Sequence, residues 1–354
     1  MVTFFLIIIY LAFISLGLPD SLLGSAWPVM RGDLHASLGT AGIISMVIAG
    51  STIVSSLFSG VVIERFGTGK VTLVSCLLTA VALLGFSWSP SLVWLIICAI
   101  PLGIGAGAVD AGLNNYVALH YKAHHMSWLH CFWGVGATLG PIIMASFIAE
   151  DKVWRQGYFT VACIQFILVV IIFVSLPLWD KVAKKSIEGK AEAQKEETIE
   201  VLEQHEKTKK PWQIKGVKLA MITFLFYCGI EASMGLWGSS FLVNVKGLPA
   251  ATAAQWVSWF YIGITAGRMI TGFITFAMSS RVLIRYGQFI ALVGALLLVL
   301  PLPSIISLIG FMIVGLGLAP IFPCMLHETP ARFGKKTLSL LWGSKWLLPI
   351  RGVH

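Results

Sequence analysis

Three carboxylic acids lie inside long apolar runs of the sequence, at Asp20, Asp110 and Glu231. An ionisable side chain at the centre of a bilayer helix costs roughly 2.5–3.5 kcal/mol on insertion scales, so it calls for a reason. Desolvation disfavours the charged form, and a carboxyl that faces a partly dry cavity can therefore bind and release a proton near neutral pH. We interpret the three acids as candidates for proton coupling. The alternative is that each pairs with a buried partner and only holds helices together.

Two amides follow one of these acids. Asn114 and Asn115 lie four and five residues after Asp110, so Asn114 shares its helical face. An amide both donates and accepts hydrogen bonds, which suits the hydroxyl groups of a sugar. We interpret both as candidate substrate-binding residues, with helix–helix hydrogen bonding as the alternative.

Aromatic and imidazole side chains could complete a binding site. Among the 13 tryptophans, most are explained by anchoring at the membrane interface, and we select Trp133 and Trp237 as candidates for stacking on a sugar. His130 could relay protons. A lone histidine near a helix end is more often structural, and we prefer that interpretation for His130 while keeping it in the candidate site.

The composition places these residues in a membrane protein. Of the 354 residues, 57% are hydrophobic and 12% are charged, and the mean hydropathy is +0.86. A soluble domain carries roughly 25% charged residues. The six cysteines are scattered without a CxxC pair, so we expect no metal centre and no disulfide scaffold. No nucleophile–base set is visible, so we expect neither an enzyme nor a cofactor.

Apolar runs long enough to cross a bilayer predict an all-α integral membrane protein with ten spans. The first run is too long for a cleavable signal and no basic region precedes it. The predicted spans are 3–27, 39–63, 71–89, 92–119, 127–148, 157–178, 218–244, 252–277, 282–300 and 302–325.

Lysine and arginine gather in alternate loops, above all between spans six and seven. The positive-inside rule therefore predicts a cytoplasmic amino terminus, and it explains the net charge of +9 without a nucleic-acid partner. We expect residues 1–178 to form a six-helix bundle, 179–217 a charged cytoplasmic linker, and 218–336 a second bundle.

The two halves contain an internal repeat. Asp20 and Gly24 of span one match Glu231 and Gly235 of span seven at an offset of 211, and Gly-x-Gly pairs in spans four and ten match at an offset of 212. Such a repeat predicts a duplicated six-span unit in parallel orientation with a site between the halves. The alternative is that glycines recur by chance in membrane helices.

The loop between spans two and three resembles the signature loop of the major facilitator superfamily. It runs from Gly60 through Glu64, Arg65 and Gly67 to Lys70, with glutamate where aspartate is usual. The resemblance implies two six-helix bundles, here with the second incomplete. It also implies gate roles for Glu64, Arg65 and Lys70. We group with them Arg268, a basic residue deep in span eight, which we expect to pair with an acid of the cavity or of the cytoplasmic gate.

Within that superfamily the chain resembles the fucose-permease and sugar–proton symporter branch. The residues that carry the likeness are Asp20 after Gly-Leu-Pro, the Asp110–Asn115 segment, and His130 to Trp133. The resemblance implies proton coupling and sugar binding at Asp20 and Asp110. The segment ending in Gly140-Pro141 is similar to a motif of exporters.

The family that the chain resembles has twelve spans, but the sequence after span ten does not continue into an eleventh and a twelfth. Residues 337–354 are too few for two spans, and they include Lys345, Pro349 and Arg351. We hypothesise a frameshift, because synonymous codons exist whose shifted frame encodes an apolar, glycine-bearing run. An adenine-rich stretch at Lys335–Thr337 would supply the slippage point. The nucleotide sequence decides between this and an authentic short tail.

These features predict a monomeric secondary transporter of the plasma membrane that works by alternating access. Its expected partners are a small polar solute such as a sugar, protons and the lipid bilayer. Two alternatives remain: an exporter of drugs or metabolites, and a truncated remnant that inserts but does not transport.

Overall fold

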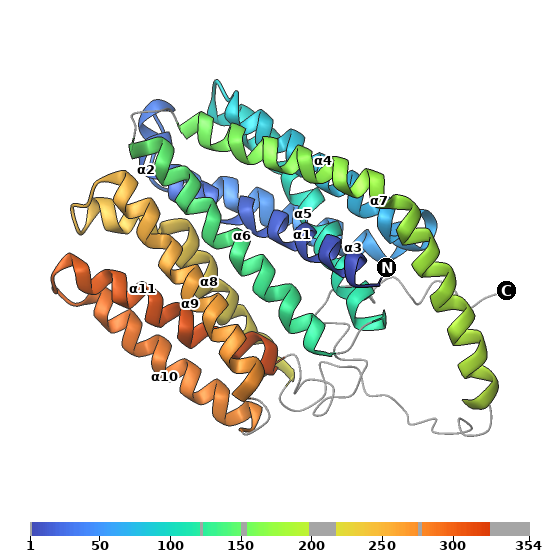
Figure 1. Ribbon diagram of the computed structural model, residues 1–354. Helices are drawn as coiled ribbons and strands as arrows, with labels where there is room; N and C mark the ends of the chain where they lie inside the picture. Colours follow the sequence, from blue (N-terminus) through green and yellow to red (C-terminus); the bar gives the residue numbers. More distant parts are fainter. Residues whose placement is uncertain (1, 121–122, 150–153, 198–216, 275–277, 326–354) are drawn as a thin grey trace.

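The computed structural model describes residues 2–120, 123–149, 154–197, 217–274 and 278–325. These residues form eleven helices and no strand (Figure 1). The helices are α1 (Val2–Asp20), α2 (Leu22–Asp33), α3 (Thr40–Phe66), α4 (Thr68–Ser87), α5 (Leu92–His120), α6 (Ala123–Ala149), α7 (Trp154–Glu197), α8 (Val217–Asn244), α9 (Ala250–Ile274), α10 (Ser280–Val299) and α11 (Ser304–Leu318).

The all-α membrane fold is confirmed, and each predicted span corresponds to helix in the structure. The first span is divided into α1 and α2, and α7 continues past the predicted span to Glu197. Eight stretches of the described residues are long and apolar enough to cross a membrane. α8 and α9 are not among these eight, although their bounds match the predicted spans 218–244 and 252–277. Residues 326–354, on which the hypothesis of a shifted tail falls, lie outside the described residues.

The helices form two groups, α1–α7 and α8–α11, and the repeat seen in the sequence is confirmed in their packing (Figure 1). Gly103 of α5 lies against α3, and Gly315 of α11 lies against α9. Gly105 of α5 faces α4, and Gly317 of α11 faces α10. Equivalent glycines therefore permit equivalent close approaches in the two groups.

The two groups meet through two pairs of helices, α6 with α9 and α2 with α8. At the second contact Gly24 lies against the backbone of its repeat-related counterpart Gly235, and a side chain on Gly24 would collide with the carbonyl oxygen of Gly235. Further along the same pair, Arg31 donates a hydrogen bond to the side-chain oxygen of Asn244 at 3.0 Å. α2 and α8 are thus packed closely on the side of the bundle where Asp33 ends α2, which we call the Asp33 side.

The opposite side of the bundle, where α1 begins, is called the N-terminal side. Here α3 passes into α4 through the single residue Gly67, whose φ is +82° and ψ is +151°. Such a backbone conformation is essentially restricted to glycine. The glycine of the signature loop is therefore required by this tight turn.

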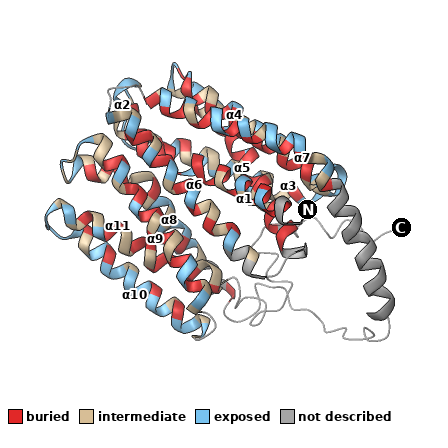
Figure 2. Ribbon diagram, viewed as in Figure 1, coloured by how far each residue is buried: buried red, intermediate tan, exposed pale blue. Residues whose placement is uncertain are grey.

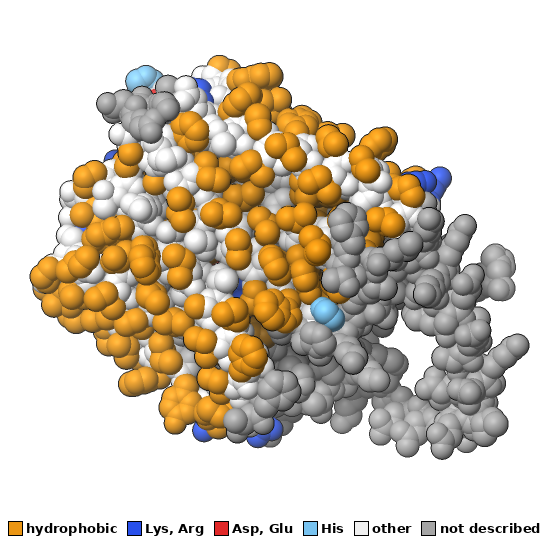
Figure 3. Space-filling model, in the orientation of Figure 1, with side chains coloured by type: hydrophobic (Ala, Val, Ile, Leu, Met, Phe, Trp, Pro, Cys, Tyr) orange, Lys and Arg blue, Asp and Glu red, His pale blue; other side chains and the backbone are white. Residues whose placement is uncertain are grey.

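Buried side chains lie inside each of the two groups of helices, and much of the outer surface is apolar (Figures 2 and 3). Trp27, Phe86 and Tyr158 are among the largest fully buried side chains, whereas Phe289 and Val299 of α10 are 65% and 81% exposed. Figure 3 shows hydrophobic side chains spread over much of the described part of one face, with most of the visible Lys and Arg near its margins. An apolar belt of this kind matches the hydrocarbon core of a bilayer.

Two glycines of α1 and α8 differ in their surroundings. A side chain on Gly17 of α1 would collide with the backbone of α6 at Trp133 and Ala137. Gly229 of α8, one residue beyond the position that matches Gly17 at the offset of 211, has no neighbour within 4 Å among the described residues. The position of Gly17 on α1 is therefore covered by α6, while that of Gly229 on α8 is open in the described part of the chain.

Candidate functional site

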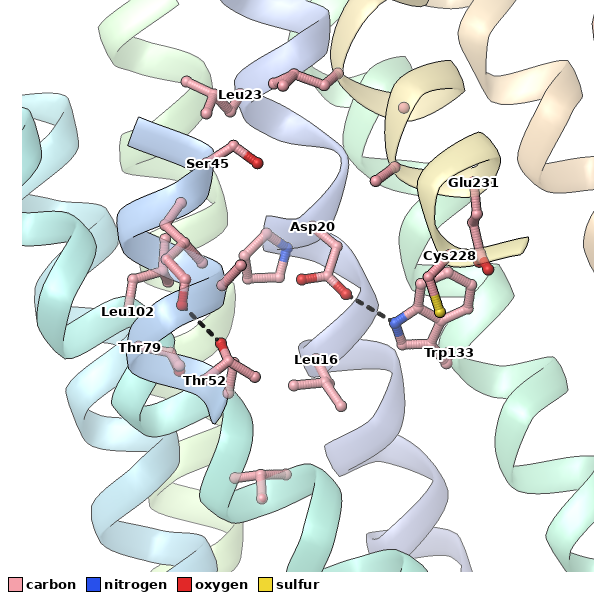
Figure 4. Close-up of a pocket in the computed structure, with 18 of the residues that line it drawn as sticks. Leu16, Asp20, Leu23, Ser45, Thr52, Thr79, Leu102, Trp133, Cys228 and Glu231 are labelled. Atoms are coloured by element: carbon pink, nitrogen blue, oxygen red, sulfur yellow. Dashed lines mark hydrogen bonds between the residues drawn. The ribbon is translucent and has the colours of Figure 1, made fainter. Parts of the chain in front are cut away.

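A cavity of about 430 Å³ lies between the two groups of helices (Figure 4). Its walls come from α1 to α6 and from α8 and α9, so both halves of the repeat contribute. Most of the lining is apolar. The polar or aromatic side chains in it include Ser15, Asp20, Ser45, Thr52, Thr79, Trp133, Glu231 and Tyr261.

A break between α1 and α2 brings Asp20 to the cavity. Pro19 has no N–H, so the carbonyl oxygen of Ser15, four residues earlier, has no helical donor. The amide of Gln165 on α7, which is fully buried, donates a hydrogen bond to this oxygen instead. Ser21 lies between the two helices and is assigned to neither. The helix is thus broken beside Pro19, and the freed carbonyl is satisfied from a neighbouring helix.

Asp20 is exposed to the cavity and accepts a hydrogen bond from Trp133. The indole Nε1 of Trp133 lies 2.9 Å from Oδ2 of Asp20, and Figure 4 shows the ring pointing at the carboxylate. Gly17, one turn before Asp20, allows this approach because it lies against the backbone of Trp133. The ring that we expected to stack on a sugar therefore also holds the carboxylate of α1.

Arg268 of α9 and Glu231 of α8 form the charged part of the second group. Arg268 is 8% exposed, and its Nη2 lies 3.7 Å from Oε1 of Glu231 and 3.2 Å from the hydroxyl of Tyr227. Its guanidinium carbon lies 5.1 Å from the centre of the Trp133 ring, within the range of cation–π attraction. Arg268 therefore pairs with an acid of the cavity, which is one of the two partners that the sequence predicted.

These contacts form one continuous chain of interactions across the two groups. It runs from Asp20 of α1 through Trp133 of α6 to Arg268 of α9, and from there to Glu231 of α8. Two acids from repeat-related positions thus lie at its two ends.

Asp110 and Asn114 pair with each other outside the cavity lining. Nδ2 of Asn114 donates to Oδ1 of Asp110 at 2.9 Å, and Asn114 is 2% exposed. Its side-chain oxygen has no hydrogen-bond partner among the described residues. Asn115 lies on α5, but its side chain is outside the described part of the structure. The structure therefore brings the Asp110–Asn114 pair near the cavity without placing it on the wall.

His130 and Trp237 also lie outside the lining. The edges of Phe13 and Phe322 approach the His130 ring, with centroids 5.9 Å and 5.6 Å away. Nε2 of His130 is buried without a hydrogen-bond partner among the described residues. Trp237 of α8 packs at the margin of the apolar core of the first group, near Gly42.

Glu64, Arg65 and Lys70 are exposed at the N-terminal side of the bundle, at the end of α3 and the start of α4. The guanidinium of Arg65 lies 5.5 Å from the centre of the adjacent Phe66 ring. No ion pair is formed by these three residues within the described ranges. Their gate role stays a prediction.

Sequence reasoning did not select three residues of the site: Gln165, Tyr227 and Tyr261. Gln165 is a lone amide in an otherwise apolar span, which is the signal that could have indicated it. Tyr227 binds Arg268, and Tyr261 lines the cavity edge-on to Trp133 with a centroid distance of 6.2 Å. In the described residues no group of three or more His, Cys, Asp or Glu side chains is arranged to hold a metal ion.

The chain is similar to transport proteins in sequence. The glucose/mannose transporter GlcP of Bacillus subtilis is 23% identical over 332 residues, which cover 90% of this chain and 77% of that protein. The cis,cis-muconate transport protein of Acinetobacter baylyi is 19% identical over 284 residues, which cover 78% of this chain and 67% of that protein.

A solved D-xylose–proton symporter is similar in fold, with a TM-score of 0.72 at 12% identity over 96% of this chain and 86% of the symporter. At this identity the likeness concerns the fold alone. The family profile described as Major Facilitator Superfamily matches residues 9–343, which is nearly the whole chain. The chain therefore belongs to the Major Facilitator Superfamily of membrane transporters.

Proposed function

We propose that this transporter moves a small sugar across the plasma membrane by alternating access, coupled to the movement of protons. The observation that carries the proposal is the cavity itself: it lies between the two repeat-related groups and is lined by Asp20, Trp133 and Glu231. A sequence relative described as a glucose/mannose transporter supports the substrate class.

The residues of the cavity divide into two roles. The exposed carboxylate of Asp20 is the proton-binding group, because it is accessible from the cavity and lies at a break in a membrane helix. Trp133 and Tyr261 offer aromatic surface to a sugar ring, while Ser45, Thr52 and Glu231 offer partners for its hydroxyls. Asp110 and Asn114 assist without lining the cavity in this structure. Asn115, His130 and Trp237 remain candidate substrate contacts in another conformation.

Alternating access requires the two groups to close on one side of the site at a time. In this structure α2 and α8 are packed together on the Asp33 side through Gly24 and Gly235, with Arg31 bound to Asn244. Opening of this contact, and closure at Glu64, Arg65 and Lys70 on the other side, would complete the cycle.

We infer from the distribution of charge that the N-terminal side faces the cytoplasm. We also propose that the protein acts as a monomer. Loops on this side carry Arg65 and Lys70, and the long linker 179–217 is rich in lysine. A reporter that is active only in the cytoplasm, fused to either end of the linker, checks this orientation. An inactive reporter at the linker, together with an active one when it is fused into a loop of the Asp33 side, would reverse the orientation.

Transport assays with the full chain in proteoliposomes test the function. Labelled D-glucose, D-mannose and D-xylose are offered with and without an imposed proton gradient. We expect uptake of at least one sugar to rise when the side of sugar addition is acid. Absence of uptake for all three sugars, under both conditions, overturns the sugar assignment.

The same vesicles separate uptake from export. The exporter alternative draws support from Gly140, which lies against the helix break at Ser21 and thereby places the Gly140-Pro141 motif beside the site. For an exporter, an imposed gradient drives a preloaded lipophilic dye out of the cytoplasmic compartment and leaves the sugars unmoved. Either result assigns the direction.

A further inference from the structure

Trp133 is held at both of its ends by groups from different halves of the protein. Its indole N–H donates to Oδ2 of Asp20 at 2.9 Å, and its ring lies 5.1 Å from the guanidinium carbon of Arg268. Its own helix, α6, packs closely against α9, where Gly134 lies against the hydroxyl of Thr265. The side chain thus lies between the cavity carboxylate and the contact of the two halves.

We propose that Trp133 is a positioning residue that transmits the protonation of Asp20 to the contact between α6 and α9. The inference rests on the proposed function in one respect only: it takes Asp20 as the group that binds the proton. It does not depend on the solute being a sugar.

The first step of the argument concerns the hydrogen bond. A hydrogen bond to an ionised acceptor is roughly twice as strong as one between neutral groups. When Asp20 is ionised, the N–H of Trp133 is held firmly at 2.9 Å. When a proton from cavity water binds to a carboxylate oxygen of Asp20, the charge is lost and the hold on the indole weakens.

The second step concerns the other end of the ring. A cation–π contact is stronger when the cation is desolvated than when it is exposed to solvent. Arg268 is 8% exposed, so its contact with Trp133 belongs to the desolvated kind. A ring released by Asp20 is free to turn, and Arg268 then loses part of this attraction.

The third step concerns Glu231, whose interaction with Arg268 becomes stronger. Nη2 of Arg268 is 3.7 Å from Oε1 of Glu231, longer than a direct hydrogen bond, and Nε of Arg268 has no partner in the described residues. An arginine released from the indole has room to shorten its distance to Glu231 on α8. Protonation of Asp20 in the first half thereby strengthens the pair of Arg268 and Glu231 in the second half, beside the α6–α9 contact.

Other titratable or charged groups lie around Asp20 and its partners and must be controlled in any experiment on pH. They come from α4, α5, α6, α8 and α9, whereas in the cavity lining α2 contributes Leu23 and the polar side chains of α3 are hydroxyls. The groups are Cys76 on α4, Asp110 on α5, His130 and Cys131 on α6, Cys228 and Glu231 on α8, and Tyr261 and Arg268 on α9.

The test uses the full chain in lipid nanodiscs without any solute. Spin labels are attached through a keto amino acid at Pro90 and Leu302, which lie in loops of the two groups on the Asp33 side, so that the six native cysteines stay. Pulsed electron resonance measures the distance distribution between the labels at acid and at alkaline pH. We expect the distribution to change with pH in the parent protein.

Two substitutions on α6 then separate the proposal from a general effect of losing an indole. Trp133→Phe keeps an aromatic ring beside Arg268 but removes the N–H donor to Asp20. We expect it to lose the pH-dependent change. Trp128→Phe is the matched control, because Trp128 lies on the same helix and is 45% exposed. We expect it to behave as the parent.

Asp20→Asn provides a second, independent check that holds even if Trp133→Phe fails to fold. The amide keeps an oxygen acceptor for the indole but is neutral at every pH, so the distribution should stay in its acid form. A pH response that persists in Trp133→Phe or in Asp20→Asn, or that is absent from the parent, overturns the proposal. If the label distances change as expected but no sugar is taken up, the substrate assignment is overturned and the role of Trp133 stands.

Discussion

Gln165 donates a hydrogen bond from Nε2 to the main-chain carbonyl oxygen of Ser15. This oxygen is the one that Pro19 leaves without a helical donor, and Gln165 is fully buried. An unpaired carbonyl is costly in a membrane interior because no water is available to replace the lost bond. The amide of α7 thus stabilises the break between α1 and α2 that presents Asp20 to the cavity.

Gln165→Leu should therefore destabilise the protein through the unpaired carbonyl of Ser15. We expect a loss of about 1–3 kcal/mol, the usual cost of leaving one buried polar group unsatisfied. The measurement is the midpoint of unfolding in a denaturant series in detergent micelles. The fold of the rest of α7 should be unaffected, because leucine suits its apolar surroundings.

Pro19→Ala supplies the control for this prediction. Alanine restores an N–H at position 19, which can reach the carbonyl of Ser15 in the ordinary helical way. Gln165→Leu should then cost clearly less in the Pro19→Ala background than in the parent, as a double-mutant cycle would detect. Equal costs in both backgrounds would show that the amide stabilises the protein by some other contact.

A second prediction concerns a polar cluster on the Asp33 side. Oδ2 of Asp33 accepts hydrogen bonds from Nε1 of the fully buried Trp154 at 2.8 Å and from Arg155 at 3.3 Å. Removing an exposed ion pair costs about 0.2–1 kcal/mol, whereas leaving a buried donor unpaired costs about 1–3 kcal/mol. Asp33→Ala should therefore lower the unfolding midpoint more than Arg155→Ala does. Asp33→Asn keeps an acceptor for Trp154, so its unfolding midpoint should be close to that of Arg155→Ala. A lower midpoint for Arg155→Ala than for Asp33→Ala would contradict the assignment.

A third prediction compares two glycines with different surroundings, Gly17 of α1 and Gly229 of α8. A side chain at Gly17 collides with the backbone of α6 beside Trp133, so Gly17→Val should separate α1 from α6 and strongly reduce the yield of folded protein. Gly229→Val should be tolerated, because nothing in the described residues lies within 4 Å of a side chain there. Size-exclusion profiles of the two variants, purified in parallel, make the comparison. Equal damage from both would mean that the flank of α8 is covered in the folded protein.

Much of the fold could be predicted because a bilayer imposes strong constraints on a sequence. Runs of about 20 apolar residues have few alternatives to helices, and the 211–212 offset indicated which helices are equivalent. The break beside Pro19 agrees with the chemistry of proline, which has no N–H to continue the helix. The end of α7 at Glu197 was not predicted, because charged helix and charged coil look alike at the level of hydropathy.

The partners of the site residues were harder to predict, because they depend on how each helix is rotated about its axis. Trp133 and Asp20 are 113 residues apart, and only the packing of α1 on α6 shows that the indole N–H faces the carboxylate. Asn114 was correctly placed on the face of Asp110, since four residues make nearly one helical turn. Whether that face lines the cavity could not be read from spacing, and the structure places it behind the wall.

The last prediction concerns the proton-binding role of Asp20. Asp20→Asn removes the exchangeable proton but keeps an oxygen to accept the hydrogen bond of Trp133, so the site should keep its shape. We expect sugar uptake driven by a proton gradient to be abolished, while exchange of labelled for unlabelled sugar across the membrane continues, because exchange requires no net proton movement. Glu231→Gln is the matched substitution in the second half; it weakens the pair with Arg268 at 3.7 Å, so both uptake and exchange should fall together. Gradient-driven uptake that survives in Asp20→Asn would exclude Asp20 as the coupling group and direct attention to Asp110, the other candidate acid inside the predicted spans of the first half.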